Sequence, residues 1–138
     1  MNWVTYALLG AFAAGATAVL AKLGLEGIPS NLAMAIRTTV VLILAWGLVL
    51  ARHEQATVSL LTARTWIFLA LSGVATGVSW IAYFKALSLA PVVRVAPIDK
   101  LSLVFTLGLA ALVLGEALSW RAVLGAVLMV AGAALTLS

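Results

Sequence analysis

The chain has 138 residues, of which 65% are apolar types and only 9% are charged. A soluble domain carries about a quarter charged and about half apolar residues, so this composition excludes an ordinary water-soluble domain. The net charge is +4, but the sequence has no run of basic residues and no interleaving of aromatic with basic residues, so no nucleic-acid partner is expected. In a membrane protein such an excess of positive charge lies in loops and near lipid phosphates.

Metal and thiol chemistry are also poorly supported. The chain has no cysteine, which excludes disulfides and thiolate metal sites. Its single histidine, His53, lies in a polar loop and is interpreted as solvated rather than as a metal ligand. We expect no metal and no cofactor. The N-terminal MNW has no basic segment and leads into a run long enough to span, so no cleavable signal peptide is expected.

Five apolar stretches are long enough to cross a bilayer, which takes about 20 helical residues. They cover residues 3–23, 32–51, 65–87, 92–114 and 120–137. Backbone groups in lipid must be satisfied within the segment, and the alternation of a barrel is absent, so each stretch is expected to be a helix. Trp3, Trp66 and Trp120 open three of them, as interfacial anchors do. The predicted fold class is an all-α integral membrane protein, with residues 1–138 as one five-helix domain.

Small residues on two of these helices predict close helix contacts. Gly73 and Gly77 form a GxxxG spacing in the third, and Gly125 and Gly132 lie in the fifth. Packing inside the bundle is the first interpretation, and a contact between subunits is the second.

The loop charges give little preference for one orientation. Five spans put the termini on opposite sides; the N-terminal side carries Arg52, Arg64 and Arg121, and the other carries Lys22, Lys85 and Arg94, with Arg37 and Lys100 deeper. Because Lys and Arg asymmetry sets orientation, such a chain is expected to insert both ways. Two opposed copies would have the symmetry of inverted-repeat transporters.

Arg37, Asp99 and Lys100 lie further from the ends of the predicted spans than the other charged residues do. Arg37 lies roughly 9 Å along the second helix, and Asp99 in the fourth is at a similar depth, so the two are predicted to pair, with Lys85 as an alternative partner. Neighbours on a helix are about 100° apart, so Lys100 is expected to point away from Asp99. Pro97 favours a discontinuous fourth helix, although proline in a first turn is ordinary.

Two interpretations of this charged cluster remain open. Intramembrane charges mark substrate or ion pathways. Alternatively, Arg37 and Lys100 extend to the headgroups while Asp99 pairs with one of them. On the third helix, hydroxyl and aromatic residues recur at spacings of three and four. This stripe predicts either the wall of a pocket or plain packing between helices. Its members are Ser72, Thr76, Ser79, Trp80 and Tyr83.

No catalytic or nucleotide-binding motif occurs in the sequence, so we do not expect an enzyme, and an ion or solute gradient is the expected energy source. The segment LGEALSW, residues 114–120, is followed by a glycine-bearing last helix. VSWIAYFKALSLAPVVRVAPIDKLSLVFT, residues 78–106, holds Tyr83, Ala86 and Leu87 in a Tyr–x–x–Ala–Leu pattern before a proline. Together these motifs resemble the EamA-type repeat of the drug/metabolite transporter superfamily.

The resemblance implies a multi-pass transporter of small metabolites in the cytoplasmic membrane, often an exporter. Most members carry two inverted repeats, ten helices in all, whereas this chain has one, which implies an antiparallel homodimer working by alternating access. It also implies a structural role for Gly115 and Glu116, and a dimer contact through the small residues of the fifth helix.

In such a dimer, Arg37, Asp99 and Lys100 are predicted to act as paired gates or as an anchor for a carboxylate, which suits the two-pronged donors of arginine. The alternatives are a membrane scaffold subunit and a small dual-topology ion channel.

Overall fold

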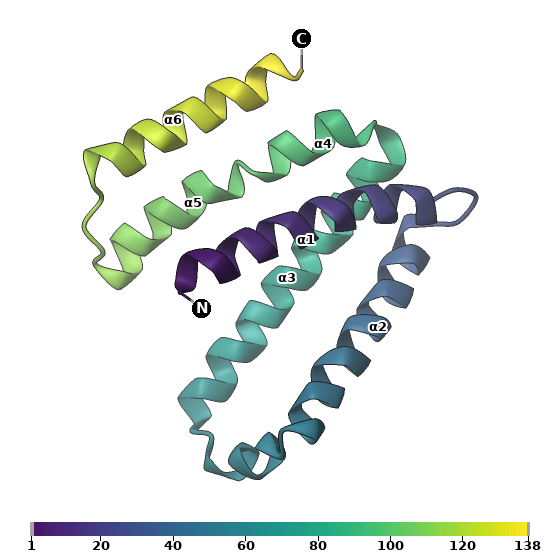
Figure 1. Cartoon of the computed structure of the whole chain (residues 1–138), viewed down its shortest axis with the longest axis vertical. Helices are drawn as coiled ribbons and strands as arrows, with labels where there is room; N and C mark the ends of the chain where they lie inside the picture. The colour runs from purple at the N-terminus through teal and green to yellow at the C-terminus, as the bar shows by residue number, and fades with distance from the viewer. Residues whose placement is uncertain (1, 138) are drawn as a thin grey trace. The chain divides into compact units, whose positions relative to one another are not determined.

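The computed structural model describes residues 2–137, and over that range it contains helices and no strand. The elements in chain order are α1 (Trp3–Gly24), α2 (Ser30–Ala51), the 3-10 helix η1 (Glu54–Leu60), α3 (Ala63–Leu89), α4 (Val92–Asp99), α5 (Ser102–Leu109), the π-helical turn η2 (Ala110–Leu114) and α6 (Trp120–Leu135) (Figure 1). Four segments are long and apolar enough to cross a membrane, and α6 is a shorter apolar helix. The prediction of an all-α protein with five membrane helices is confirmed.

The chain divides into two compact units, each described by itself. The central unit is Leu20–Ser88, and the terminal unit joins the residues up to Val19 with those from Leu89 onward.

The central unit holds the end of α1, then α2, η1 and α3. α2 and α3 run as two antiparallel arms joined through η1, which occupies the loop that the sequence left without structure (Figure 1). Its buried side chains are small or apolar: Leu25, Ala33, Phe84 and Leu87. The ammonium Nζ of Lys22 donates a hydrogen bond of 2.6 Å to the carbonyl of Leu87, which ties the end of α1 to the end of α3.

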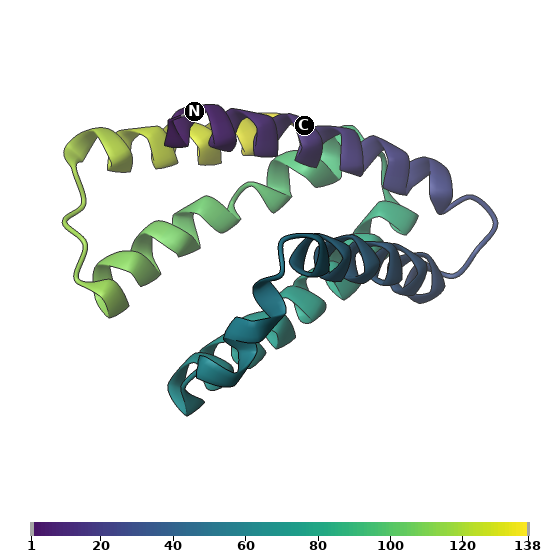
Figure 2. The same ribbon diagram turned by 60° about the horizontal axis from the view of Figure 1, so that its bottom comes forward.

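In the terminal unit, the fourth span is broken rather than continuous. Pro97 lies inside α4 and has no N–H to donate to the carbonyl of Val93. Beyond Asp99 the bonding tightens: the amide of Leu101 donates to Ile98 at 2.9 Å, and that of Leu103 to Lys100 at 3.1 Å. Such three-residue spacing is typical of 3-10 turns. Figure 2 shows the ribbon narrowing between α4 and α5 at this point.

The fourth span ends at a left-handed turn formed by one glycine. Gly115 has a φ of 69°, the left-handed region, and the amides of Gly115 and Glu116 both donate to the carbonyl of Ala110. Turning the chain back in this way satisfies a carbonyl that a helix end would leave open. α6 then begins with the Ser119 hydroxyl accepting from the amide of Ala122 at 3.2 Å, as an N-cap does.

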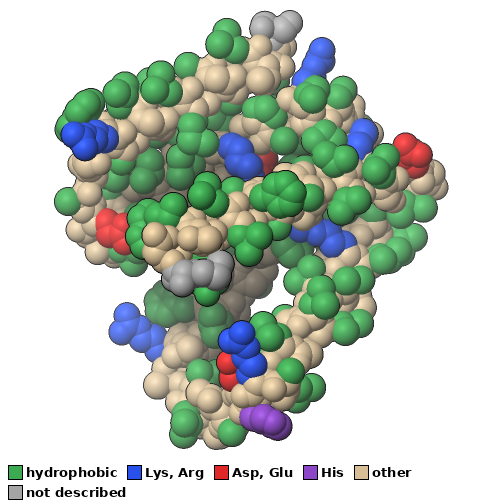
Figure 3. Space-filling model, viewed as in Figure 1, with side chains coloured by type: hydrophobic (Ala, Val, Ile, Leu, Met, Phe, Trp, Pro, Cys, Tyr) green, Lys and Arg blue, Asp and Glu red, His purple; other side chains and the backbone are tan. Residues whose placement is uncertain are grey.

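The helices expose apolar side chains on nearly all sides. Within each candidate span, at most 6% of the residues in the most apolar window are buried, and Figure 3 shows apolar side chains over most of the visible face with charges scattered among them. Helices that are hydrophobic all round need lipid or another helix as their surroundings. The chain is therefore an integral, multi-pass membrane protein.

Candidate functional site

Arg37 of α2 and Trp80 of α3 are brought together in the central unit. The guanidinium carbon of Arg37 lies 4.3 Å from the centre of the Trp80 ring and 5.5 Å from that of Phe84. Trp80 and Phe84 are four residues apart, so they lie one above the other on the same helix face. Both distances are within the range of cation–π attraction, which contributes about 0.5–2 kcal/mol.

The ring of Phe84 is fixed by its surroundings. Its side chain is 2% exposed, and the ring of Tyr83 packs against it edge to face, 6.5 Å away at 73°. Leu87, three residues on, is fully buried. The aromatic surface under Arg37 is therefore held by the core of the central unit. We call Arg37, Trp80 and Phe84 the arginine shelf.

The shelf lies inside the span and not at its edge. Arg37 is seven residues from the start of α2, roughly 10 Å along its axis, while Trp80 and Phe84 are roughly 13 Å and 7 Å from the end of the antiparallel α3. The guanidinium is nearer to Trp80, the deeper ring. The guanidinium therefore lies beside a part of α3 that is inside the span.

Within the central unit, Arg37 forms these two ring contacts and no ion pair or hydrogen bond to its guanidinium. The ion pairs found in that range join other residues: Arg52 to Glu54 at 4.0 Å and Lys100 to Asp99 at 3.1 Å. Arg37 is half-buried, so its guanidinium is partly removed from water. Within the central unit, the contacts that replace this water are those with the two aromatic rings.

The residues of α3 that were predicted to line a pathway are more exposed than Phe84. Ser79 and Lys85 are exposed, whereas Trp80 and Tyr83 are half-buried. The hydroxyl of Thr76 donates to the carbonyl of Ser72 at 2.9 Å, an ordinary bond within the helix. Of the stripe, Trp80 is the residue that the structure joins to a predicted intramembrane charge. The prediction that Lys85 belongs to a substrate pathway is not tested by this arrangement.

The prediction that Lys100 points away from Asp99 is wrong. The ammonium of Lys100 lies 3.1 Å from Oδ2 of Asp99, in a pair that is 57% and 35% exposed. The 100° rule applies to neighbours within a continuous helix, whereas α4 ends at Asp99. Arg37 belongs to the central unit and Asp99 to the terminal unit, so their pairing stays a prediction.

The glycines singled out for helix contacts have open surroundings within their own units. A Cβ built on Gly73, Gly77, Gly125 or Gly132 would meet no atom within 4 Å. Packing inside either unit therefore does not explain them. A contact with a second copy stays a prediction.

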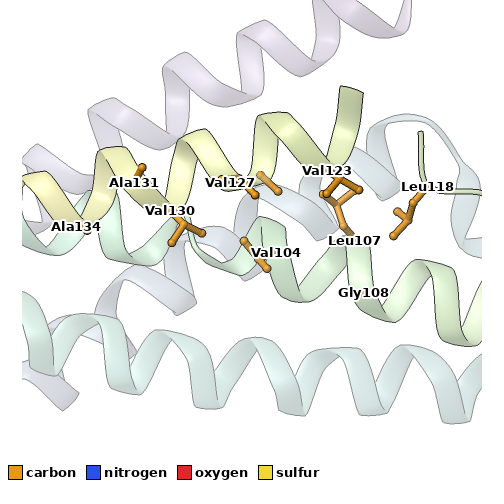
Figure 4. Close-up of a pocket in the computed structure, with 10 residues that line it drawn as sticks. Val104, Leu107, Gly108, Leu118, Val123, Val127, Val130, Ala131 and Ala134 are labelled. Atoms are coloured by element: carbon orange, nitrogen blue, oxygen red, sulfur yellow. The ribbon is translucent and has the colours of Figure 1, made fainter. Parts of the chain in front are cut away.

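An apolar groove lies between α5 and α6 in the terminal unit. It has a volume of about 500 Å³, and Val104, Leu107, Val123 and Val130 point into it (Figure 4). Solute sites need a few placed polar groups to fix orientation, and all the lining residues are apolar or glycine. The groove suits hydrocarbon, and the arginine shelf is the better candidate for a polar ligand.

The sequence missed the part that Phe84 plays in the shelf. A signal was present, because Phe84 follows Trp80 by four residues and both lie about as far from the end of α3 as Arg37 lies from the start of α2. The sequence does not show how the two helices are rotated about their axes, so it could not show that these residues face one another.

Comparison with known proteins bears on the whole chain. The model of the EamA-like transporter family matches residues 1–138. A protein of Sinorhizobium sp, named "uncharacterized transporter in cobO 3′ region", is 47% identical over 134 residues, which are 97% of this chain and 95% of that protein. No solved structure matches the chain. With its apolar helices and its resemblance at the LGE segment, the chain belongs to the EamA-like transporter family.

Proposed function

We propose that the protein is a secondary transporter of small metabolites, an exporter in the cytoplasmic membrane that works as an antiparallel homodimer by alternating access. The observation that carries this proposal is the family match over residues 1–138. The relative named as a transporter adds support, and the sequence holds no nucleotide-binding motif that would indicate an ATP-driven pump.

The number of spans supports the homodimer. Inverted-repeat transporters place their substrate site between two halves of opposite orientation, and this chain supplies the helices of one half. The matching relative is also about one repeat long, because the 134 aligned residues are 95% of it. A second copy in the opposite orientation provides the missing half.

Transport is tested in liposomes that contain the purified protein. Uptake of labelled monocarboxylates and amino acids is measured with and without the same compound, unlabelled, inside the vesicles. A transporter shows saturable uptake that the internal compound accelerates. Non-saturating flux at channel rates favours the ion channel, and the absence of flux for every compound favours the scaffold subunit.

Orientation is tested by cysteine labelling, since the chain has no native cysteine. Glu26 and Glu54 are both exposed and lie at opposite ends of α2, so Glu26→Cys and Glu54→Cys report opposite sides of the membrane. In intact cells treated with an impermeant maleimide, the dual orientation predicts that about half of each variant is labelled. Full labelling of one variant and none of the other would show a single orientation and refute the antiparallel dimer.

A further inference from the structure

We propose that the arginine shelf is a carboxylate-binding subsite, in which the guanidinium of Arg37 binds the carboxylate of the solute while Trp80 and Phe84 hold it flat. The proposal rests on the proposed function in so far as the bound solute is the one transported. It assigns the substrate class: small metabolites that carry a carboxylate.

The first step is the free bonding capacity of Arg37. A guanidinium has five N–H donors in a rigid plane, and none of these donates to an acceptor within the central unit. The two ring contacts are not hydrogen bonds, so they use none of the N–H donors along the edge of the plane. That edge matches a carboxylate through two parallel hydrogen bonds, which lysine cannot form in the same geometry.

The second step is the charge around the shelf. At this end of the central unit, Lys22 and Lys85 are the other cations, and Glu26 is the acid in the adjoining turn. Lys22 donates a hydrogen bond to the carbonyl of Leu87 at this end of the unit. An excess of positive charge in a region of low dielectric attracts an anion and disfavours a cation.

The third step is the depth of the site. The guanidinium lies roughly 10 Å along the helix from its start, further in than the phosphates of the lipid headgroups. A small solute that enters from water can reach this level, whereas a headgroup reaches it only if the bilayer deforms. Both sources offer an oxyanion, so the experiment includes an arm for each.

The test uses Trp80 as the reporter. Replacing the other tryptophans (W3F, W46F, W66F and W120F) leaves Trp80 as the only indole, and the protein is placed in vesicles of phosphatidylcholine. Sodium benzoate is titrated against benzamide, which has the same ring and no charge. We expect benzoate to change the Trp80 emission saturably, at concentrations about tenfold lower than any effect of benzamide.

Variants at Arg37 decide which group binds. Arg37→Gln is expected to remove the saturable response, and Arg37→Lys to weaken it about tenfold, with circular dichroism confirming that each variant is folded. Arg64→Gln is the matched control: Arg64 also stacks on a ring, that of Phe68 at 5.7 Å, in the same unit, and its loss should leave the benzoate response unchanged.

Three results would overturn the subsite: equal responses to benzoate and benzamide, an unchanged response in Arg37→Gln, or a response to phosphatidylglycerol vesicles with none to benzoate, which would make a lipid headgroup the ligand. The binding test is separate from transport. Saturable benzoate binding without solute flux keeps the subsite and contradicts the transporter, whereas flux with no Trp80 response contradicts the subsite alone.

Discussion

Gly115 gives the LGE segment a physical meaning. Its φ of 69° is a conformation that costs an L-residue about 1–2 kcal/mol. The left-handed turn directs two successive amides back to the carbonyl of Ala110. The motif is therefore a helix-ending device, which agrees with the structural role implied by the resemblance.

Replacing Gly115 with alanine is expected to lower stability by about 1–2 kcal/mol through backbone strain alone, because no atom lies within 4 Å of the added Cβ. Gly115→Asn should lose less, since asparagine tolerates this conformation. Thermal unfolding in detergent micelles measures the difference. Gly47→Ala, inside α2 and four residues before its end, with equally open surroundings, should not destabilise; equal losses in all three variants would contradict the argument.

At the residue scale, the sequence identified the charged residues, but it offered Lys100 as a partner of Asp99 in only one of its two interpretations and did not pair Arg37 with Trp80. Arg37, Asp99 and Trp80 were all singled out. The contact of Arg37 with Trp80 depends on how α2 and α3 are rotated toward each other, which residue spacing within one helix does not encode. The pair formed by Asp99 and Lys100 depends on a helix end, and the same spacing rule gave the wrong answer once the helix was interrupted.

At the element scale, the fourth span is two half-helices joined at Lys100 and Leu101. In lipid, carbonyls left without an amide partner are costly unless water or protein supplies one. Many transporters form their substrate and ion sites at discontinuous membrane helices. Pro97 has no amide to continue the hydrogen bonds of the helix, and the hydrogen bonds that follow it have three-residue spacing. These two features explain the interruption.

Pro97→Ala is expected to restore the amide that bonds to the carbonyl of Val93 and to make the span more continuous. Proline costs about 3 kcal/mol relative to alanine inside a helix, and recovering half of that slows amide exchange at residues 100–103 roughly tenfold. Hydrogen–deuterium exchange measures this. Pro91→Ala is the control, because Pro91 is the N-cap of α4 and needs no amide there; a slowing of equal size in Pro91→Ala would contradict the explanation.

α6 is the shortest span and starts from one side-chain cap. Ser119→Ala removes the hydroxyl that accepts from the amide of Ala122, and its expected cost is about 1 kcal/mol. Ser119→Asn keeps an acceptor and should stay near the parent protein. Unfolding midpoints in micelles compare the two, and an equal loss in both would mean that the cap does not hold the start of α6.

The positions of the helices were largely predictable, because an apolar run bounded by glycine, proline and charges has few alternatives in a bilayer. The first three helices and the last begin and end within a few residues of their predicted limits. The 3-10 turn of η1 and the π-helical turn of η2 were not predicted. Both depend on local hydrogen-bond choices that hydropathy does not register.

At the scale of the whole molecule, the proposed dual orientation depends on a small difference in loop charge, so a single added lysine should bias it. One lysine near the membrane surface is worth about 1 kcal/mol, which changes the ratio of the two orientations about fivefold. Glu54→Lys and Glu26→Lys add charge at opposite ends of α2 and should bias the chain in opposite directions. Maleimide labelling of a Gln55→Cys reporter, exposed in η1, measures the fraction in each orientation.

The two variants also test the assembly itself. If the working unit is an antiparallel pair, a population biased to one orientation lacks partners, so transport should fall about in proportion to the scarcer orientation. Co-expression of Glu54→Lys with Glu26→Lys supplies both orientations and should restore it. The loss of the Arg52–Glu54 pair should not affect the result, because that pair is exposed and 4.0 Å apart, a class of ion pair that contributes little to stability. Full transport by either variant alone, at a labelled fraction of about one sixth or five sixths after the fivefold bias, would show that the scarcer orientation is not limiting and would contradict the antiparallel dimer.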